Sequence, residues 1–271
     1  MKDDYGAASL VKLVWPLMDT LISLTNLTTP DLLIISFAAL VAAIVSGLGG
    51  FGGGFIVVII LTPIIGAKSV IPLLSVFALC SNFSRVYIYR HDIRWKFVFL
   101  ITLASLPGVY LGSEFLARVS EVLLLAFLGV VLLLVIPLRN YLKKTEFTPG
   151  TPSILALGLV FGLVSGAAAG SGMFVIAGLN AAGLHGMALL GTDAAIGVVN
   201  SAARVLAFWR VGLMSTDLVC AGILMGIITL PGTWIASLIV AKLGTRIHNR
   251  LIEVLIVVGG IWFIVQAVMK M

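Results

Sequence analysis

Two short polar clusters interrupt long apolar stretches and contain the residue types that bind anions. Residues 81–85 read SNFSR and residues 200–204 read NSAAR. In each cluster an amide or hydroxyl residue stands three positions before an arginine, so on a helix both side chains share a face. The planar guanidinium donates a fork of hydrogen bonds that fits an oxyanion. The predicted anion clamp comprises Asn82, Arg85, Asn200, Ser201 and Arg204.

An alternative explanation for each arginine is that its side chain reaches the membrane–water interface. Arg85 and Arg204 lie inside or near the end of long apolar stretches. A charge at the bilayer centre costs roughly 2.5–3.5 kcal/mol on the mildest scale. A long side chain near a helix end avoids that cost by extending to water. The sequence alone leaves both explanations open.

Glycine-dense runs mark one point in each half of the chain. Residues 46–54 read SGLGGFGGG and residues 165–172 read SGAAAGSG. Glycine disfavours a helix by about 1 kcal/mol relative to alanine, and broken backbone in a bilayer is tolerated only where it is buried or lines a cavity. Helix N-termini after such breaks attract anions. The substrate-binding residues predicted from these runs are Ser46, Gly49, Gly50, Gly52, Gly53, Ser165, Gly170, Ser171 and Gly172.

Close helix packing through small residues is the competing explanation for these glycines. A dinucleotide site is excluded by context, although residues 47–52 spell GxGxxG. No short strand precedes them, and Lys68-Ser69 stands where an acid is expected about 20 residues on. The second run is diluted by Ala167–Ala169, which leaves its backbone less exposed, so the site is expected to be asymmetric.

Asp193 and two prolines complete the set of candidate functional residues. Asp193 is an acid within an apolar stretch that could pair with an arginine, carry a coupling proton or cap a helix start. Pro107 and Pro231 should kink their helices, and could act as hinges or accommodate neighbouring broken helices. Motifs of intramembrane enzymes do not occur, so we expect no enzyme, metal site or cofactor.

The composition indicates a lipid environment. Of the 271 residues, 61% are hydrophobic and 10% are charged, whereas soluble domains carry about 25% charged residues. The net charge of +6 comes from basic residues in gaps between apolar runs, which is typical of positive-inside anchoring and not of a nucleic-acid surface. Cys80 and Cys220 are expected to be small buried apolar residues. We therefore expect an all-α polytopic membrane protein.

The chain contains ten apolar segments, some of them shorter than the 20 or so residues that span a bilayer. Two pairs, 31–47 with 54–66 and 153–168 with 172–184, could each form two tilted spans or a re-entrant hairpin, which gives about 8–10 membrane segments. The remaining segments are 70–89, 97–116, 122–138, 187–209, 217–240 and 251–269.

The polar stretches divide the chain into two halves. Residues 1–28 are expected to form an interfacial segment with an amphipathic helix at 7–24. A first repeat follows at 29–138. The gap at 139–152 contains Pro149, Gly150 and Pro152 and is the predicted linker. The second repeat comprises 153–271.

The halves resemble each other at a constant offset. Ser46 matches Ser165 at 165 − 46 = 119, and Arg85 matches Arg204 at 204 − 85 = 119. Pro107 matches Pro231 at 231 − 107 = 124, which implies a five-residue insertion in the second half. The sequence therefore predicts an internal repeat.

The distribution of basic loops predicts that the repeats are inverted. The gap at 90–96 is basic, whereas its counterpart holds only Arg210; the gap after 97–116 holds Arg118 flanked by two glutamates, whereas its counterpart at 241–250 is basic. Positive-inside logic places 90–96, 139–150 and 241–250 in the cytoplasm of a plasma-membrane protein and both termini outside it.

The chain resembles the sulfite exporter TauE/SafE family, also described as the toluene-sulfonate uptake permease family, from residue 31 to about residue 269. The resemblance is carried by the glycine run at 47–54, its echo at 166–172, the Gly-Thr-Asp stretch at 191–193 and the Pro-Gly pairs in both halves. It implies secondary transport of sulfite or small sulfonates, with binding between the repeats.

We therefore expect a secondary transporter of a small oxyanion, most simply sulfite or an organosulfonate, with export favoured over uptake. Moving one negative charge out of a negative cytoplasm gains about 2.3 kcal/mol per 100 mV. The alternatives are an anion channel and an uptake permease for another small anion. The sequence leaves open whether two chains form a homodimer.

Overall fold

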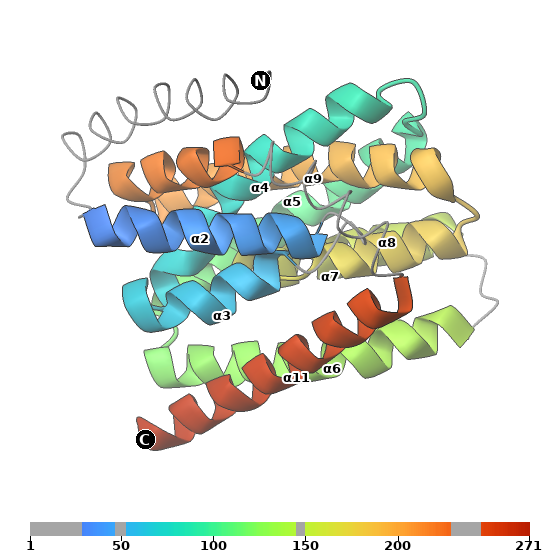
Figure 1. The fold of residues 1–271 in the computed structure, drawn as a ribbon. Helices are drawn as coiled ribbons and strands as arrows, with labels where there is room; N and C mark the ends of the chain where they lie inside the picture. Colours follow the sequence, from blue (N-terminus) through green and yellow to red (C-terminus); the bar gives the residue numbers. More distant parts are fainter. Residues whose placement is uncertain (1–28, 47–52, 145–149, 229–244) are drawn as a thin grey trace, which may run out of the picture.

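The computed structural model describes residues 29–46, 53–144, 150–228 and 245–271, and these residues form helices joined by short turns, with no strand (Figure 1). Within these residues the prediction of an all-α protein is confirmed, and the described part of each apolar segment corresponds to one helix. The helices are α2 Thr29–Ser46, α3 Gly53–Ile65, α4 Ala67–Tyr89, α5 Trp95–Arg118, α6 Glu121–Lys144, α7 Thr151–Ala167, α8 Gly172–Ala181, α9 Gly186–Arg210, a helix at Thr216–Ile228, and α11 Thr245–Met269. The proposed interfacial helix at 7–24, Gly49, Gly50, Gly52 and Pro231 lie outside the described residues.

Among the described residues, three helices, α4, α5 and α9, are long and apolar enough to cross a membrane. Their outward surfaces carry large apolar side chains, such as Phe83, Leu111 and Leu206, each at least 60% exposed. Contiguous apolar surface of this kind is unfavourable in water and stable against lipid. The fold is that of an integral membrane protein.

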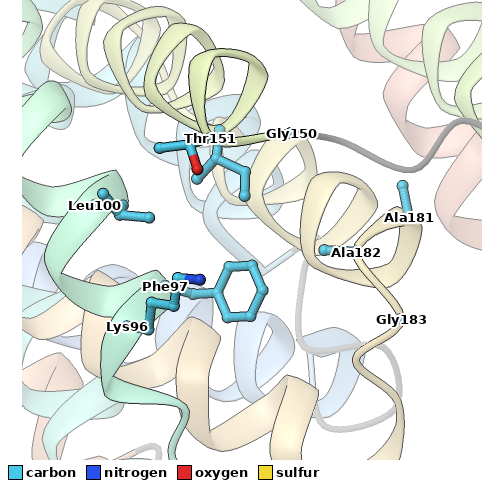
Figure 2. A pocket seen from close by; sticks show the side chains of 9 residues that line it. Lys96, Phe97, Leu100, Gly150, Thr151, Ala181, Ala182 and Gly183 are labelled. Carbon is cyan, nitrogen blue, oxygen red and sulfur yellow. The ribbon is translucent and has the colours of Figure 1, made fainter.

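Helices α7 and α8 form a hairpin. Gly178 of α8 packs against the Leu157 side chain of α7. The outer ends of both helices, Thr151 and Ala181, line one pocket at the same end of the bundle (Figure 2). The ten residues of α8 extend about 15 Å at 1.5 Å per residue, which is half of the 30 Å or so of a hydrocarbon core. The second arm of this hairpin is therefore shorter than a helix that spans a bilayer.

The corresponding pair in the first half, α2 and α3, starts from the opposite end. Gly66 alone separates α3 from α4 and has a φ of 81°, so α3 ends where α4 begins. Lys68 at the start of α4 donates a hydrogen bond from Nζ to the carbonyl oxygen of Ala117 at the end of α5 (3.2 Å). The C-terminus of α3 therefore lies at the end of the bundle where α5 ends. The α7–α8 hairpin opens at the opposite end, where α5 begins.

Two helix pairs form the centre of the molecule. α4 and α9 are antiparallel, because Arg85 near the end of α4 contacts Asp193 near the start of α9, and Arg204 near the end of α9 contacts Ile71 near the start of α4. α5 and α7 are parallel and approach closely through small residues. An added Cβ on Gly162 would meet the Ser105 backbone, and one on Gly166 would meet the Val109 backbone. These two glycines of α7 therefore allow close helix packing.

The outermost pair, α6 and α11, is also antiparallel. Lys270, directly after α11, forms an ion pair with Glu121 at the start of α6 (2.7 Å). The C-terminal end of α6 and the N-terminal end of α11 therefore lie together, at the same end of the bundle as the α4–α5 turn (Figure 1). The loops predicted to be basic and cytoplasmic flank these three elements.

The helix starts reproduce the offsets read from the sequence. α3 and α8 start at 53 and 172, and α4 and α9 at 67 and 186, so both offsets are 119; α6 and α11 start at 121 and 245, an offset of 124. The other two pairs differ, since α2 and α7 start 151 − 29 = 122 residues apart, and α5 and the helix at Thr216–Ile228 start 216 − 95 = 121 residues apart. One boundary differs from expectation, since α6 continues to Lys144 and takes up part of the linker at 139–152. Pro149-Gly150 is the first strong helix breaker after Pro137, so the polar end of α6 stays helical.

Candidate anion-binding site

The broken segment of the second half contacts the start of α3, which follows the first glycine run. α7 ends at Ala167, Ala168 is extended, and Gly170 has a φ of +85° before α8 starts at Gly172. The Phe55 ring, two residues into α3, covers Gly170 so closely that no Cβ would fit there. The start of α3 and the break before α8 therefore meet at Phe55 and Gly170, whereas residues 47–52 of the first glycine run lie outside the described residues.

A hydrogen bond links the end of α7 to the middle of α9. Asn200 Nδ2 donates to Ser165 Oγ at 3.0 Å, and both residues are buried, at 3% and 0% exposure. Ser201 and Ser171 are buried as well. The polar residues predicted around the second break therefore do lie in the interior.

Arg85 forms an ion pair with the intramembrane acid. Its Nη2 lies 3.1 Å from Asp193 Oδ2, and its Nη1 donates to Asn82 Oδ1 at 3.2 Å. The two charged side chains are 22% and 11% exposed. Of the three roles that the sequence allowed for Asp193, pairing with an arginine is the one seen, and Asn82 shares the face of Arg85 as the three-residue spacing predicted.

Arg204 lies in a different environment. It is 7% exposed and therefore does not extend to the interface. Its Nη2 donates to the backbone carbonyl of Ile71 at 3.2 Å, its guanidinium lies 5.8 Å from the centre of the Phe208 ring, and its Nε has no hydrogen-bond partner. Within the described part of the chain, no carboxylate lies within ion-pair distance of Arg204.

The two arginines are too far apart to hold one ion between them. Asp193, which marks the position of Arg85, is 204 − 193 = 11 residues from Arg204 on α9. Eleven residues correspond to about three turns and about 16 Å. The predicted four-residue clamp thus divides into an Arg85–Asn82–Asp193 cluster and an Arg204 cluster with Asn200 and Ser165 one turn away.

The clusters differ at the positions of both groups that bind Arg85, because the second half has Ser201 at the position equivalent to Asn82, since 82 + 119 = 201. The 119-residue offset relates Arg85 to Arg204, and it relates Asp193 to Leu74, since 193 − 119 = 74. Leu74 is buried and lies one turn from Ile71, whose carbonyl Arg204 contacts. The first half therefore has an apolar side chain where the second half has a carboxylate.

The family model described as Sulfite exporter TauE/SafE matches residues 35–263, which is most of the chain. The chain belongs to this family. No curated protein and no solved structure matches it. Membership places the protein among membrane transporters for anions of the sulfite type rather than among enzymes, and every described residue of both arginine clusters lies within the matched region.

The TauE/SafE protein also has a surface pocket at the end where α5 and α7 begin. Its volume is about 340 Å³, and Lys96, Phe97, Thr151 and Gly183 are among the residues that line it (Figure 2). Figure 2 shows the Phe97 ring between the start of α7 and the turn after α8. The pocket lies at the end of the bundle that holds Arg85 and Asp193, and Arg204 lies toward the other end.

Sequence reasoning missed the residues that give Arg204 its surroundings. Phe208 follows Arg204 at helical spacing and could have been found from the i, i+4 rule. Leu74 could have been found by applying the 119-residue offset to Asp193. The Ile71 carbonyl and the Phe55–Gly170 contact depend on how helices pack, and no local sequence pattern indicates them.

Proposed function

We propose that this TauE/SafE family member is a secondary transporter of a small oxyanion, either sulfite or an organosulfonate, and that it works by alternating access around a site between its two halves. The single observation that carries the proposal is Arg204. A buried guanidinium with a carbonyl partner and a free Nε is an incomplete ion pair, and a permeating oxyanion completes it.

The energetics favour a binding role for Arg204 over a structural one. A buried charge is unfavourable unless it is paired and hydrogen-bonded. The guanidinium of Arg204 has five donor hydrogens. One backbone carbonyl and the contact with the Phe208 ring satisfy only a small part of them. Asn200, one turn away on α9, donates one amide hydrogen to Ser165, and its second amide hydrogen adds a neutral donor that fits an oxygen of an oxyanion.

The antiparallel arrangement of corresponding helices supports an inverted repeat. α4 and α9 start at equivalent positions and run in opposite directions. The α2–α3 and α7–α8 pairs enter from opposite ends, and they meet at Phe55 and Gly170. Inverted repeats with broken helices that meet at mid-membrane are the architecture of many secondary transporters. In this arrangement the halves rock around the α4–α9 pair.

The direction of transport follows from the sidedness. We assign the end that holds the α4–α5 turn, the end of α6 and the start of α11 to the cytoplasm, because the flanking loops are basic. In a plasma membrane that is negative inside, an anion moves outward with the potential at a gain of about 2.3 kcal/mol per 100 mV. Export therefore needs no coupling ion.

Flux into proteoliposomes tests the proposal. Wild-type protein should take up radiolabelled sulfite or methanesulfonate with saturable kinetics, and Arg204→Gln should remove that uptake. Arg118→Gln is the matched control, because Arg118 is an exposed arginine paired with Glu114 on the surface of α5. Uptake that increases linearly with concentration would indicate a channel, and normal uptake by Arg204→Gln would refute the assignment of the site.

A further inference from the structure

In the part of the chain that the structure describes, the bundle interior carries one uncompensated positive charge. Among the described residues, Asp193 and Arg204 are the buried charged side chains, and Asp193 is joined to the partly buried Arg85. Two guanidinium groups and one carboxylate give a net interior charge of +2 − 1 = +1. Both arginines keep their charge, because a guanidinium is not deprotonated in proteins.

Resting on the proposed function, we propose that Asp193 sets the valence of the transported anion, so that the site selects monoanions such as hydrogensulfite or an alkanesulfonate over dianions such as sulfite or sulfate. Asp193 binds Arg85 in the way that the substrate binds Arg204. It neutralises Arg85, and a single negative charge at Arg204 then completes the neutralisation of the interior.

The physical reason is the dielectric environment. A bound monoanion leaves the interior neutral, whereas a dianion leaves one negative charge without a partner in a region where unpaired charge is strongly disfavoured. In water the same dianion is fully hydrated, so the unpaired charge is a penalty on binding. The position equivalent to Asp193 holds Leu74, so no second carboxylate neutralises Arg204 itself.

The effect of Asp193 on the Arg204 site should be measurable despite the distance. One unit charge about 16 Å away, at an effective dielectric constant of about 20, changes the relative affinity for a dianion and a monoanion about fivefold. Asp193→Asn should therefore raise the ratio of sulfate affinity to methanesulfonate affinity by about that factor. Asp193→Glu keeps the charge and should leave the ratio unchanged.

The experiment measures inhibition of radiolabelled methanesulfonate uptake in proteoliposomes by unlabelled methanesulfonate and by sulfate, whose charges are fixed at neutral pH. Wild-type protein should prefer methanesulfonate by at least about tenfold, since a dianion leaves one charge unpaired. Asp193→Asn should reduce that preference about fivefold relative to Asp193→Glu. The wild-type measurement alone tests the inference if Asp193→Asn does not fold.

The outcomes separate this inference from the proposed function. If wild-type protein takes up methanesulfonate but is inhibited equally well by sulfate, the valence assignment is overturned and the transporter assignment stands. The same conclusion follows if Asp193→Asn and Asp193→Glu show equal ratios. If neither sulfite nor methanesulfonate is transported, the proposed function itself fails.

Discussion

Arg85 and Arg204 occupy equivalent positions in the two halves, on helices that pack against each other, yet their surroundings differ. Arg85 has a carboxylate at 3.1 Å and an amide oxygen at 3.2 Å. Arg204 is more deeply buried and has one backbone carbonyl. The contrast teaches that two arginines at related positions can differ in their partners, one in an ion pair and one without a counter-ion, when Leu74 and Ser201 stand where the other cluster has Asp193 and Asn82.

The largest effect expected from this comparison concerns stability. Arg85→Gln leaves the Asp193 carboxylate buried without a partner, which should lower the free energy of unfolding by about 3–5 kcal/mol. Arg204→Gln removes a charge that has no counter-ion, so it should change stability little or raise it. Thermal unfolding of both variants in the same detergent measures the difference.

A double variant provides the control for that prediction. Arg85→Gln combined with Asp193→Asn removes both members of the pair and should recover most of the lost stability, since no unpaired charge remains. Equal destabilisation by Arg85→Gln and Arg204→Gln would show that the two arginines contribute equally to the stability of the fold. The contrast drawn between them would then be wrong.

The second prediction gives Arg204 the partner that Arg85 has. Leu74→Asp places a carboxylate at the position equivalent to Asp193, where it should compete with the substrate. Methanesulfonate affinity should fall about tenfold to a hundredfold, the equivalent of about 1.5–3 kcal/mol for a charged hydrogen bond. Leu74→Asn is the control with the same shape and no charge, and equal affinities in the two variants would contradict the prediction.

The third prediction concerns the break before α8 and has the smallest expected effect, a change in the free energy of unfolding. Gly170→Ala adds a methyl group at a φ of +85° and against the Phe55 ring, and it should destabilise the protein by about 1–3 kcal/mol. Gly172→Ala, where a Cβ would meet nothing within 4 Å, should be close to neutral. Thermal unfolding compares them, and similar midpoints would remove the argument that Phe55 of α3 packs against the break at Gly170.

Much of the fold could be predicted because the bilayer restricts it. Apolar runs end at helix ends, so the predicted segments 70–89 and 187–209 match α4 and α9 to within three residues. The predicted start of the linker at residue 139 was less accurate, because α6 continues beyond its apolar run as a polar helix up to Lys144. The choice between hairpin and two spans depended on packing, since segments of 10–18 residues fit either.

The candidate site was predictable in its residues and not in its connections. The types and spacing of Asn82 and Arg85, and the position of Arg204, identified the side chains that are candidates for binding an anion. Which arginine pairs with Asp193 follows from the antiparallel packing of α4 and α9, a tertiary relation that no local pattern carries. For the same reason the sequence predicted one clamp where the structure has two clusters.

The most direct test of the central claim compares two purified proteins by calorimetric titration with methanesulfonate. One carries Arg204→Gln; the other carries Arg85→Gln together with Asp193→Asn, which keeps the net interior charge at +1. The account predicts that the first loses binding and that the second still binds. Binding by the Arg204→Gln protein with wild-type affinity, or its loss in the double variant alone, would contradict the claim that Arg204 holds the anion.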